Sequence, residues 1–345
     1  MKRFGNSILL VLAICMLSAC GAHLRIDAES VSVCFKVCSD VFSKASVEGH
    51  EGDVASLDLL AFRSADGVLE KHVRAVVGTD YSASAPQVVT DFVDGNSVNW
   101  YIVANAPSDA FDGITTLMGF LSSYTGLDDS SASSLVMYGS GSLMPDHSVS
   151  DPVDVYLSRY CCKVSLENVK VTWLDNLSPG TDIRVAKVVL VNVCGQTAYS
   201  GTPVDNGVWY NKMTVDGSLP TLLADMTVKD YTLAVPSSDP LAVNASLYGM
   251  PNPVSNGVNS KTNPVWSPRN TRLALLLMVN GDENWYPVTL PAMSCNKHYM
   301  VTNLEIRGPG STGPDMPVTR DEITFEIEVT AWGEDTVEAV FASIP

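Results

Sequence analysis

The residue whose surroundings most directly specify a chemistry is Cys20. It ends the run LSAC at 17–20, which follows the basic pair Lys2 and Arg3 and an apolar stretch at 8–16. This order is typical of a bacterial lipoprotein signal, because the apolar stretch is too short for a stable membrane span and small residues precede the cysteine. We therefore expect lipidation at Cys20; an ordinary secretory signal that happens to contain a cysteine is the alternative.

The cysteines that remain do not have the spacing of a metal site. Cys34 and Cys38 lie four positions apart in an apparent strand, which separates them by roughly 13 Å, too far for a disulfide. Cys161 and Cys162 would point to opposite faces of a strand. No CxxC or Cys/His ligand spacing occurs. We expect packed thiols, with a disulfide between distant cysteines as the alternative; the redox states left open are those of Cys34, Cys38, Cys161, Cys162, Cys194 and Cys295.

The sequence contains no recognisable catalytic motif. Its histidines are scattered, and neither HExxH, GxSxG nor a phosphate-binding GxxxxGK[ST] is present. GSGS at 139–142 is better explained as a flexible turn than as a nucleophile loop. DDSS at 128–131 lacks the alternating oxygen ligands of a calcium loop. We therefore predict no enzymatic activity, no cofactor and no metal.

The charge of the chain excludes one class of partner. The formal net charge is -17, and removal of residues 1–19 takes away two positive charges and no negative one, which gives -19. A chain this acidic is repelled by phosphate groups, so nucleic acid is not expected as a partner. No second long apolar run follows, and the lipid is the only membrane attachment that the sequence indicates.

The elements that would position these residues are mostly strands. Apolar residues alternate with polar ones between turns rich in Gly, Pro, Asn and Asp, which is typical of β-structure. The expected strands are 31–37, 55–62, 100–104, 153–160, 164–173, 183–193, 231–235, 273–280, 285–290, 298–306 and 323–332. One helix is expected between a cap at Ser108 and a stop at Gly126.

The number of strands predicts an all-β fold with one or two short helices. A chain of 345 residues with 46% hydrophobic residues can bury a large core and is expected to divide into two domains. Many short strands with one crossing helix favour β-sandwiches over an alternating α/β scaffold. The polar stretch at 139–152 is the expected loop region before a second domain that opens near Tyr160.

Several short segments, in order behind the lipoprotein signal, carry a resemblance to a known family. They are ASLDLLAF (55–62), DG (66–67), YIVANAP (101–107), LSR (157–159), KV (163–164), LYGMPN (247–252), WYPV (285–288), NKHY (296–299), NLEIRGPGS (303–311), PD (314–315) and Trp332. In these pieces the chain resembles the fimbrillins, the structural subunits of the lipoprotein-derived (type V) pili of Bacteroidales. Each piece alone is weak, but together they span nearly the whole chain.

The resemblance implies two tandem transthyretin-like β-sandwich domains and assembly after a trypsin-like protease removes the N-terminal strand. The expected division is a signal peptide at 1–19, a propeptide at 20–44, an N-terminal domain at 45–159 and a C-terminal domain at 160–345. The implied partners are further copies of the chain, other fimbrial subunits, the processing protease and, through the lipid, the outer membrane. The precursor would be an outer membrane lipoprotein and the mature form part of cell-surface fimbriae.

Assembly of this kind requires a strand that is removed and a strand that replaces it. The removed strand is expected to be the one that carries Val31, Val33, Phe35 and Val37. The C-terminus, at about 333–345, repeats the spacing of its first three apolar residues with Val337, Ala339 and Phe341. The competing explanation is that any two amphipathic strands match at a period of two.

The expected cleavage site departs from the family pattern. Processing in such proteins usually follows an arginine, yet no arginine occurs between Arg25 and Arg63. Neither of these would release the first strand cleanly. Cleavage is therefore expected between Lys44 and Ala45, in a small and polar loop that a protease can reach.

Two other functional roles and two other classes of protein remain open. An anchor or tip subunit is the alternative to a stalk subunit; the replacement strand favours the stalk. A surface glycan-binding lipoprotein would also be acidic and rich in β-structure. Such a protein could stack sugars on Trp100, Trp173, Trp209, Trp266, Trp285 and Trp332. A secreted hydrolase would need a nucleophile or a metal site that the sequence does not show.

Overall fold

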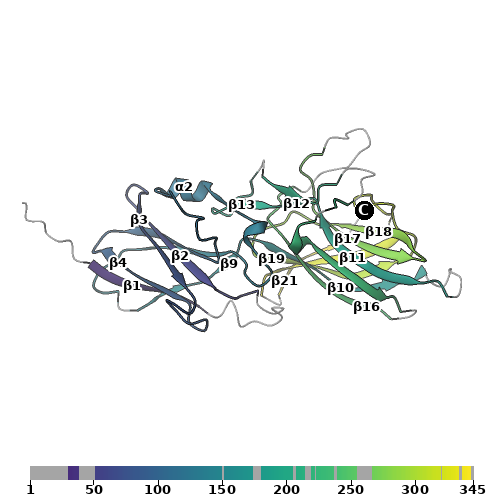
Figure 1. Ribbon diagram of the computed structural model, residues 1–345, viewed down its shortest axis with the longest axis horizontal. Helices are drawn as coiled ribbons and strands as arrows, with labels where there is room; N and C mark the ends of the chain where they lie inside the picture. The colour runs from purple at the N-terminus through teal and green to yellow at the C-terminus, as the bar shows by residue number, and fades with distance from the viewer. Residues whose placement is uncertain are drawn as a thin grey trace, which may run out of the picture.

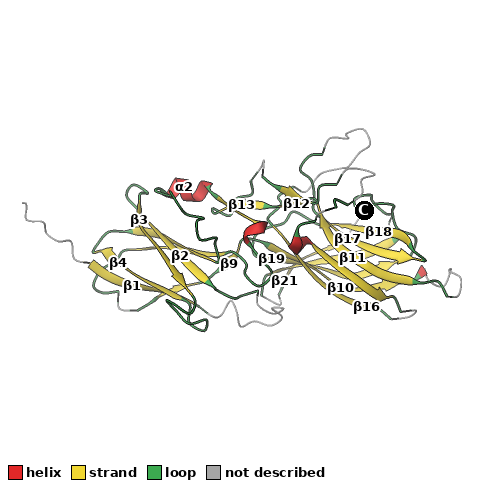
Figure 2. Cartoon of the chain, in the orientation of Figure 1, coloured by secondary structure: helices red, strands yellow, loops and turns green. Residues whose placement is uncertain are grey.

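The protein consists of two β-rich halves arranged end to end (Figure 1). The structure is a computed structural model that describes residues 30–38, 51–149, 151–173, 180–204, 207–213, 219–221, 223–236, 239–254, 266–319, 321–333 and 336–342. Strands dominate both halves (Figure 2), and each half is built around two larger sheets. The predicted all-β fold of two tandem β-sandwiches is confirmed.

The N-terminal sandwich is formed by a three-stranded and a five-stranded sheet. The first has the order β4-β1-β8 and the second the order β3-β2-β5-β7-β9. Their strands are β1 (Ser30–Val37), β2 (Ser56–Arg63), β3 (Leu69–Val76), β4 (Gln87–Val93), β5 (Val98–Ala104), β7 (Met137–Leu143), β8 (Val153–Val155) and β9 (Ser158–Arg159).

Strand β2 departs from the period of two that the sequence analysis expected of strands. Seven of its eight residues are buried, from Ser56 to Phe62. Leu57 and Leu59 pack toward the sheet that contains β1, whereas Leu60 and Phe62 pack toward the helix α2 (Leu117–Ser122) and its neighbours. Since both faces of β2 are covered, apolar residues are favoured at nearly every position.

The C-terminal sandwich is formed by a five-stranded and a four-stranded sheet. Their orders are β16-β10-β19-β20-β21 and β15-β11-β17-β18. The strands are β10 (Cys162–Val171), β11 (Ile183–Val191), β15 (Val228–Ala234), β16 (Leu241–Gly249), β17 (Arg272–Val279), β18 (Asp282–Thr289), β19 (Lys297–Ile306), β20 (Ile323–Ala331) and β21 (Val337–Ala342).

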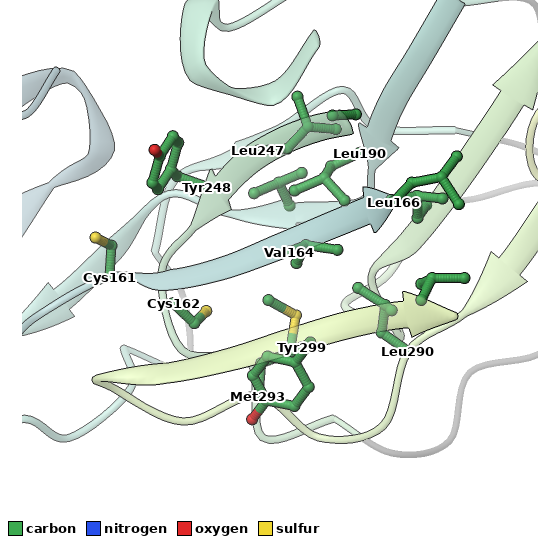
Figure 3. Packing of buried hydrophobic residues seen from close by; sticks show 14 of the residues in the cluster. Cys161, Cys162, Val164, Leu166, Leu190, Leu247, Tyr248, Leu290, Met293 and Tyr299 are labelled. Carbon is green, nitrogen blue, oxygen red and sulfur yellow. The ribbon is translucent and has the colours of Figure 1, made fainter. Parts of the chain in front are cut away.

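Figure 3 shows the buried side chains around β10. Val164 and Leu166 of β10 lie among the apolar residues of the core, and Cys161 and Cys162 project to opposite sides of the chain, as the sequence analysis expected for a strand. All six cysteines that the structure describes are free thiols. Burial raises the pKa of Cys161 to about 12, so this thiol stays protonated at neutral pH.

The predicted long helix is wrong. The segment after Ser108 forms turns, and only α2 is α-helical, with Thr116 as its N-cap. Gly113 has a φ of 78°, a left-handed conformation that interrupts a right-handed helix. The apolar side chains of this segment, such as Phe111 and Phe120, therefore belong to a turn-rich stretch that covers the outer face of β2. Two single-turn 3-10 helices are η2 (Leu127–Asp129) and η4 (Asp225–Thr227).

The two sandwiches are joined by the passage from β9 into β10 and by a small sheet between them. In that sheet β6 (Tyr124–Gly126) pairs with β13 (Gln196–Ala198), while β12 (Val193–Cys194) pairs with β14 (Trp209–Tyr210) in the C-terminal sandwich. The apolar core of the C-terminal sandwich continues through Tyr160 and Tyr199 to Phe111 and Phe120.

The described residues form neither a membrane-spanning helix nor a cluster of metal ligands. None of their helices combines the length and apolar character needed to cross a membrane. Their His, Cys, Asp and Glu side chains nowhere form a group of three that could hold a metal ion.

Candidate binding groove and terminal strand

Strand β1 is the central strand of its sheet. It pairs antiparallel with β4, from Ser30 opposite Val93 to Lys36 opposite Gln87. On its other edge it pairs parallel with β8, with Phe35 opposite Val153. Both edges of β1 therefore take part in backbone hydrogen bonding, and β4 and β8 are held together through it.

The inner face of β1 fills an apolar groove. Val31, Val33, Phe35 and Val37 are all buried, and they belong to one hydrophobic cluster with residues of β2, β4 and β5. The ring of Phe35 is 0% exposed. Its centroid lies 5.3 Å from that of Trp100 and 6.2 Å from that of Phe92, in edge-to-face geometry. These two rings line a pocket that fits an aromatic side chain at this position of the strand.

Two glycines of β7 provide space for the groove. A Cβ atom on Gly141 would lie 2.6 Å from the Trp100 ring, and one on Gly139 would lie 2.8 Å from the Tyr156 carbonyl oxygen. Any larger residue would therefore displace the ring that contacts Phe35 or the chain that follows β8.

The GSGS segment at 139–142 is part of strand β7, and the expectation of a flexible turn there is wrong. Its glycines are explained by close packing.

The C-terminal strand β21 occupies the edge of a different sheet. It pairs antiparallel with β20, with Phe341 opposite Ile327 and Ala339 opposite Val329. The register shifts between Ala339 and Val337, which is a bulge at Glu338. The Glu338 carboxylate binds Lys297 Nζ at 2.5 Å and 2.6 Å.

Strand β21 buries little of its apolar surface. Val337 is 40% exposed, Val340 58% and Phe341 43%, although Ala339 packs partly against the core. An edge strand with exposed apolar side chains and one free edge is a surface on which another chain can pair.

The structure thus places the residues of the two predicted strands in separate sheets. Residues 31–37 lie in the N-terminal sandwich and residues 337–342 at the edge of the C-terminal one, and they are not brought together within one chain. Cys20, Lys44 and Ala45 lie outside the described residues.

The comparison with known proteins rests on structure. No protein-family model matches the chain, and no curated protein matches its sequence. Among solved structures, a fimbrilin of Porphyromonas gingivalis W83 matches with a TM-score of 0.62 at 16% identity, over 88% of this chain and 98% of that one. The chain has the fimbrillin fold. The resemblance inferred from the sequence is confirmed at the level of the fold.

Two further structures agree with this match. A proposed cell adhesion protein of Bacteroides eggerthii matches with a TM-score of 0.60 and 16% identity, over 88% of this chain and 97% of that one. Another, from Parabacteroides distasonis, matches with a TM-score of 0.59 and 14% identity, over 90% and 98%. At such identities the likeness establishes the fold, and function has to be argued from the residues of this chain.

Part of this site could not be predicted from the sequence. One strand was expected at 153–160, whereas the strand is interrupted at Tyr156 and Leu157, so that β8 pairs with β1 and β9 pairs with β7. A change of sheet within a short segment leaves the period of two intact and has no sequence signal of its own. The role of Trp100 as a wall of the groove was equally invisible, because its position indicated only a core residue.

One pair of side chains outside the groove has the elements of a nucleophile and a base. Ser165 Oγ lies 2.8 Å from His298 Nε2. Burial, together with the nearby charge of Lys163, lowers the pKa of His298 to about 3. An imidazole with this pKa is a poor proton acceptor for a hydroxyl at neutral pH. In the described part of the chain no carboxylate hydrogen-bonds to His298, so the pair lacks the third member of a catalytic triad.

Proposed function

We propose that the chain is a structural subunit, of the stalk type, of a cell-surface fimbria that supports adhesion. It is exported as a lipoprotein acylated at Cys20 and is cleaved between Lys44 and Ala45. Cleavage allows β1 to leave, and β21 of a second copy then enters the vacated groove. The fold shared with a fimbrilin supports the proposal, and the central position of β1 carries it.

Loss of a central strand creates a strong binding site for another strand. Without β1, the facing edges of β4 and β8 lose their backbone partners, and the pocket between Trp100 and Phe92 is exposed to water. An incoming strand regains hydrogen bonds on two edges, each contributing about 0.5–1.5 kcal/mol. Each large side chain that it buries contributes about 1.5–3 kcal/mol. Such a contact is stable without a covalent bond.

Strand β21 is a suitable occupant of the groove because it would lose few contacts on leaving β20 and would gain backbone pairing on a second edge and burial of its apolar side chains. In the monomer it pairs on one edge only, with β20, and exposes Val337 and Phe341. In the groove it would pair on both edges and bury Val337, Ala339 and Phe341, with the Phe341 ring in the place of Phe35. The exchange breaks the ion pair of Glu338 with Lys297, which is partly exposed and contributes little.

Few observations favour a glycan-binding function. Trp100, Trp209, Trp285 and Trp332 are buried, and Trp173 and Trp266 are partly buried against the core. A sugar-stacking platform needs an exposed ring face. We therefore assign the tryptophans to the packing of the core, and we propose a fimbrial subunit and not a glycan-binding lipoprotein.

The first prediction concerns export. Cells that express the Cys20→Ala variant should accumulate unprocessed precursor, because the acylated thiol is missing. Metabolic labelling with an alkyne fatty acid should mark the wild type and leave the variant unlabelled. The Cys34→Ala variant is the control and should be labelled like the wild type. Equal labelling of wild type and Cys20→Ala would contradict lipidation at this residue.

The second prediction concerns processing. Brief treatment of the purified precursor with trypsin should produce one new N-terminus at Ala45, because Lys44 lies between two strands in a polar segment. The Lys44→Gln variant should resist this cut and should not assemble, whereas Lys36→Gln, on the outer face of β1, should behave like the wild type. A new N-terminus at another position, or degradation of the sandwiches, would show that Lys44 is not the processing site.

A further inference from the structure

Glu51 is a buried carboxylate in the segment that enters the N-terminal sandwich. It is 1% exposed and precedes β2 by a few residues. Its oxygens accept hydrogen bonds from three side chains. Lys163 Nζ and the Tyr248 hydroxyl bind Oε1 at 2.9 Å and 2.5 Å, and Trp332 Nε1 binds Oε2 at 3.2 Å. We call Glu51 and these three donors the Glu51 contact.

Every donor in the Glu51 contact belongs to the C-terminal sandwich. Lys163 lies on β10, Tyr248 lies on β16, and Trp332 follows β20 directly. Lys163 is almost as buried as Glu51, and the rings of Tyr248 and Trp332 stack with centroids 5.8 Å apart. Burying a charge is costly unless a partner compensates it, so each half of the protein is stable here only with the other half in place.

A second contact joins the sandwiches through aromatic rings. Tyr199 of the C-terminal sandwich packs against Phe111 and Phe120, at centroid distances of 5.0 Å and 5.3 Å. The Tyr160 hydroxyl donates to the Tyr199 carbonyl oxygen. We call these four residues the aromatic contact.

The crossing segment contributes to both contacts. Tyr160 belongs to the aromatic contact, whereas the guanidinium of Arg159 lies over the Trp332 ring at 4.6 Å, beside the Glu51 contact. Arg159 is fully buried and its guanidinium nitrogens have no hydrogen-bond partner. Burial lowers the pKa of this guanidinium, and the neighbouring Cys161 and Glu51 side chains oppose that shift.

The aromatic contact adjoins the β6–β13 pair, because Tyr199 directly follows β13, so these two hold the sandwiches at one place and the Glu51 contact holds them at another. Two bodies held at two separate places cannot rotate freely, whereas two bodies held at one can.

We propose that Glu51 is a positioning residue that makes the two sandwiches one rigid body and carries mechanical load between them. Trp332 directly follows β20, which pairs with β21, and Glu51 leads into β2, the neighbour of β5 beneath the groove. Tension applied between a bound β21 and a filled groove therefore passes through the Glu51 contact. The load-bearing part rests on the proposed function, whereas the rigidity is a property of the single chain.

The rigidity is tested on the unprocessed monomer by small-angle X-ray scattering. We expect Glu51→Ala to shift the longest intramolecular distance upward and to broaden the distance distribution, while circular dichroism and amide exchange in both sandwiches stay unchanged. The matched control is Glu305→Gln, which breaks an exposed pair with Arg307 at 2.6 Å and should scatter like the wild type. Scattering identical to the wild type from folded Glu51→Ala would overturn the proposal.

A second variant covers the case in which Glu51→Ala does not fold. The double variant Glu51→Gln with Lys163→Met removes both charges of the ion pair together, and the Arg159 guanidinium keeps its contact with the Trp332 ring. It should fold and still show the broader distance distribution, because an amide holds the Tyr248 and Trp332 donors less strongly than a carboxylate. A folded double variant as rigid as the wild type would overturn the proposal.

The load-bearing role is tested on assembled filaments. Filaments of the double variant should form in normal amounts, yet their persistence length in electron micrographs should fall to less than half of the wild-type value. Variant filaments as stiff as the wild type, despite a flexible monomer, would overturn the load-bearing role alone. If the processed wild type forms no filaments, the proposed function fails, and the scattering result still decides the rigidity.

Discussion

A processed subunit with Asp in place of Phe341 is expected to form no ladder of polymers on unheated gels. In the proposed assembly the Phe341 ring occupies the pocket between Trp100 and Phe92, where a carboxylate would lie between aromatic rings in the apolar core. Burying an unpaired charge there costs several kcal/mol, which the backbone hydrogen bonds of the strand do not offset. Because Phe341 is 43% exposed on an edge strand, the variant monomer should fold normally.

The matched control is Val340→Asp. Val340 neighbours Phe341 on the same strand, is 58% exposed, and points to the opposite face when the strand lies in the groove. This variant should elongate like the wild type. Deletion of residues 336–345 should abolish elongation completely. Long ladders from the deletion variant alone would show that β21 is not the strand that fills the groove. If Val340→Asp abolished elongation and Phe341→Asp did not, the face of β21 that carries Val340 would be the one that enters the groove.

The second large effect is expected at Phe35, on the stability of the precursor. The side chain is fully buried against two aromatic rings, and replacement of such a phenylalanine by alanine costs about 3–5 kcal/mol of unfolding free energy. Chemical denaturation of the precursor, followed by intrinsic fluorescence, measures this loss directly, because Trp100 forms a wall of the affected pocket.

Phe35→Ala has two controls. One is a substitution of the neighbouring Lys36, and the other is the polymerisation of processed subunits. Lys36→Ala changes an exposed side chain and should alter the unfolding free energy by about 0.5 kcal/mol or less. After cleavage and loss of β1, subunits made from Phe35→Ala and from wild type are chemically identical and should polymerise equally. A Phe35→Ala precursor as stable as the wild type would mean that β1 contributes little to the monomer and that its removal creates no strong site.

The burial pattern of β1 could be read from the sequence because one face of that strand is covered and the other is not. Val31, Val33, Phe35 and Val37 alternate with polar or small residues, and the structure buries these four. Most strands of the C-terminal sandwich were also located, but β16 was not predicted, and β3, β4 and β7 of the N-terminal sandwich were missed as well. The prediction of a long helix after Ser108 was wrong because apolar residues in consecutive turns can have the same spacing as those on one face of a helix. Gly113 was a local sign that the helix is interrupted.

The partners of β1 could not be predicted, because pairing is a long-range property. Phe35 lies opposite Val153, more than a hundred residues away, and the three residues of β8 are too few to show a pattern.

The role of Glu51 was not predicted for a different reason. It lies in the polar stretch EGHEGD at 48–53, which has the composition of a solvated loop, and only the donors from distant strands show that it is buried.

In the proposed assembly, the mixed pairing of β1 would determine the polarity of the filament. A strand that replaces β1 has to run antiparallel to β4 and parallel to β8, so it can enter in one direction only. In that assembly the groove and β21 belong to different sheets of one copy, so each copy would give one strand and receive one. This is a head-to-tail association, which forms an open filament where its rotation does not close a ring. The two ends of the polymer are then chemically different: one carries an empty groove and the other an unclaimed strand. A protein that caps one end needs a strand but no groove, and a protein that caps the other needs a groove but no strand.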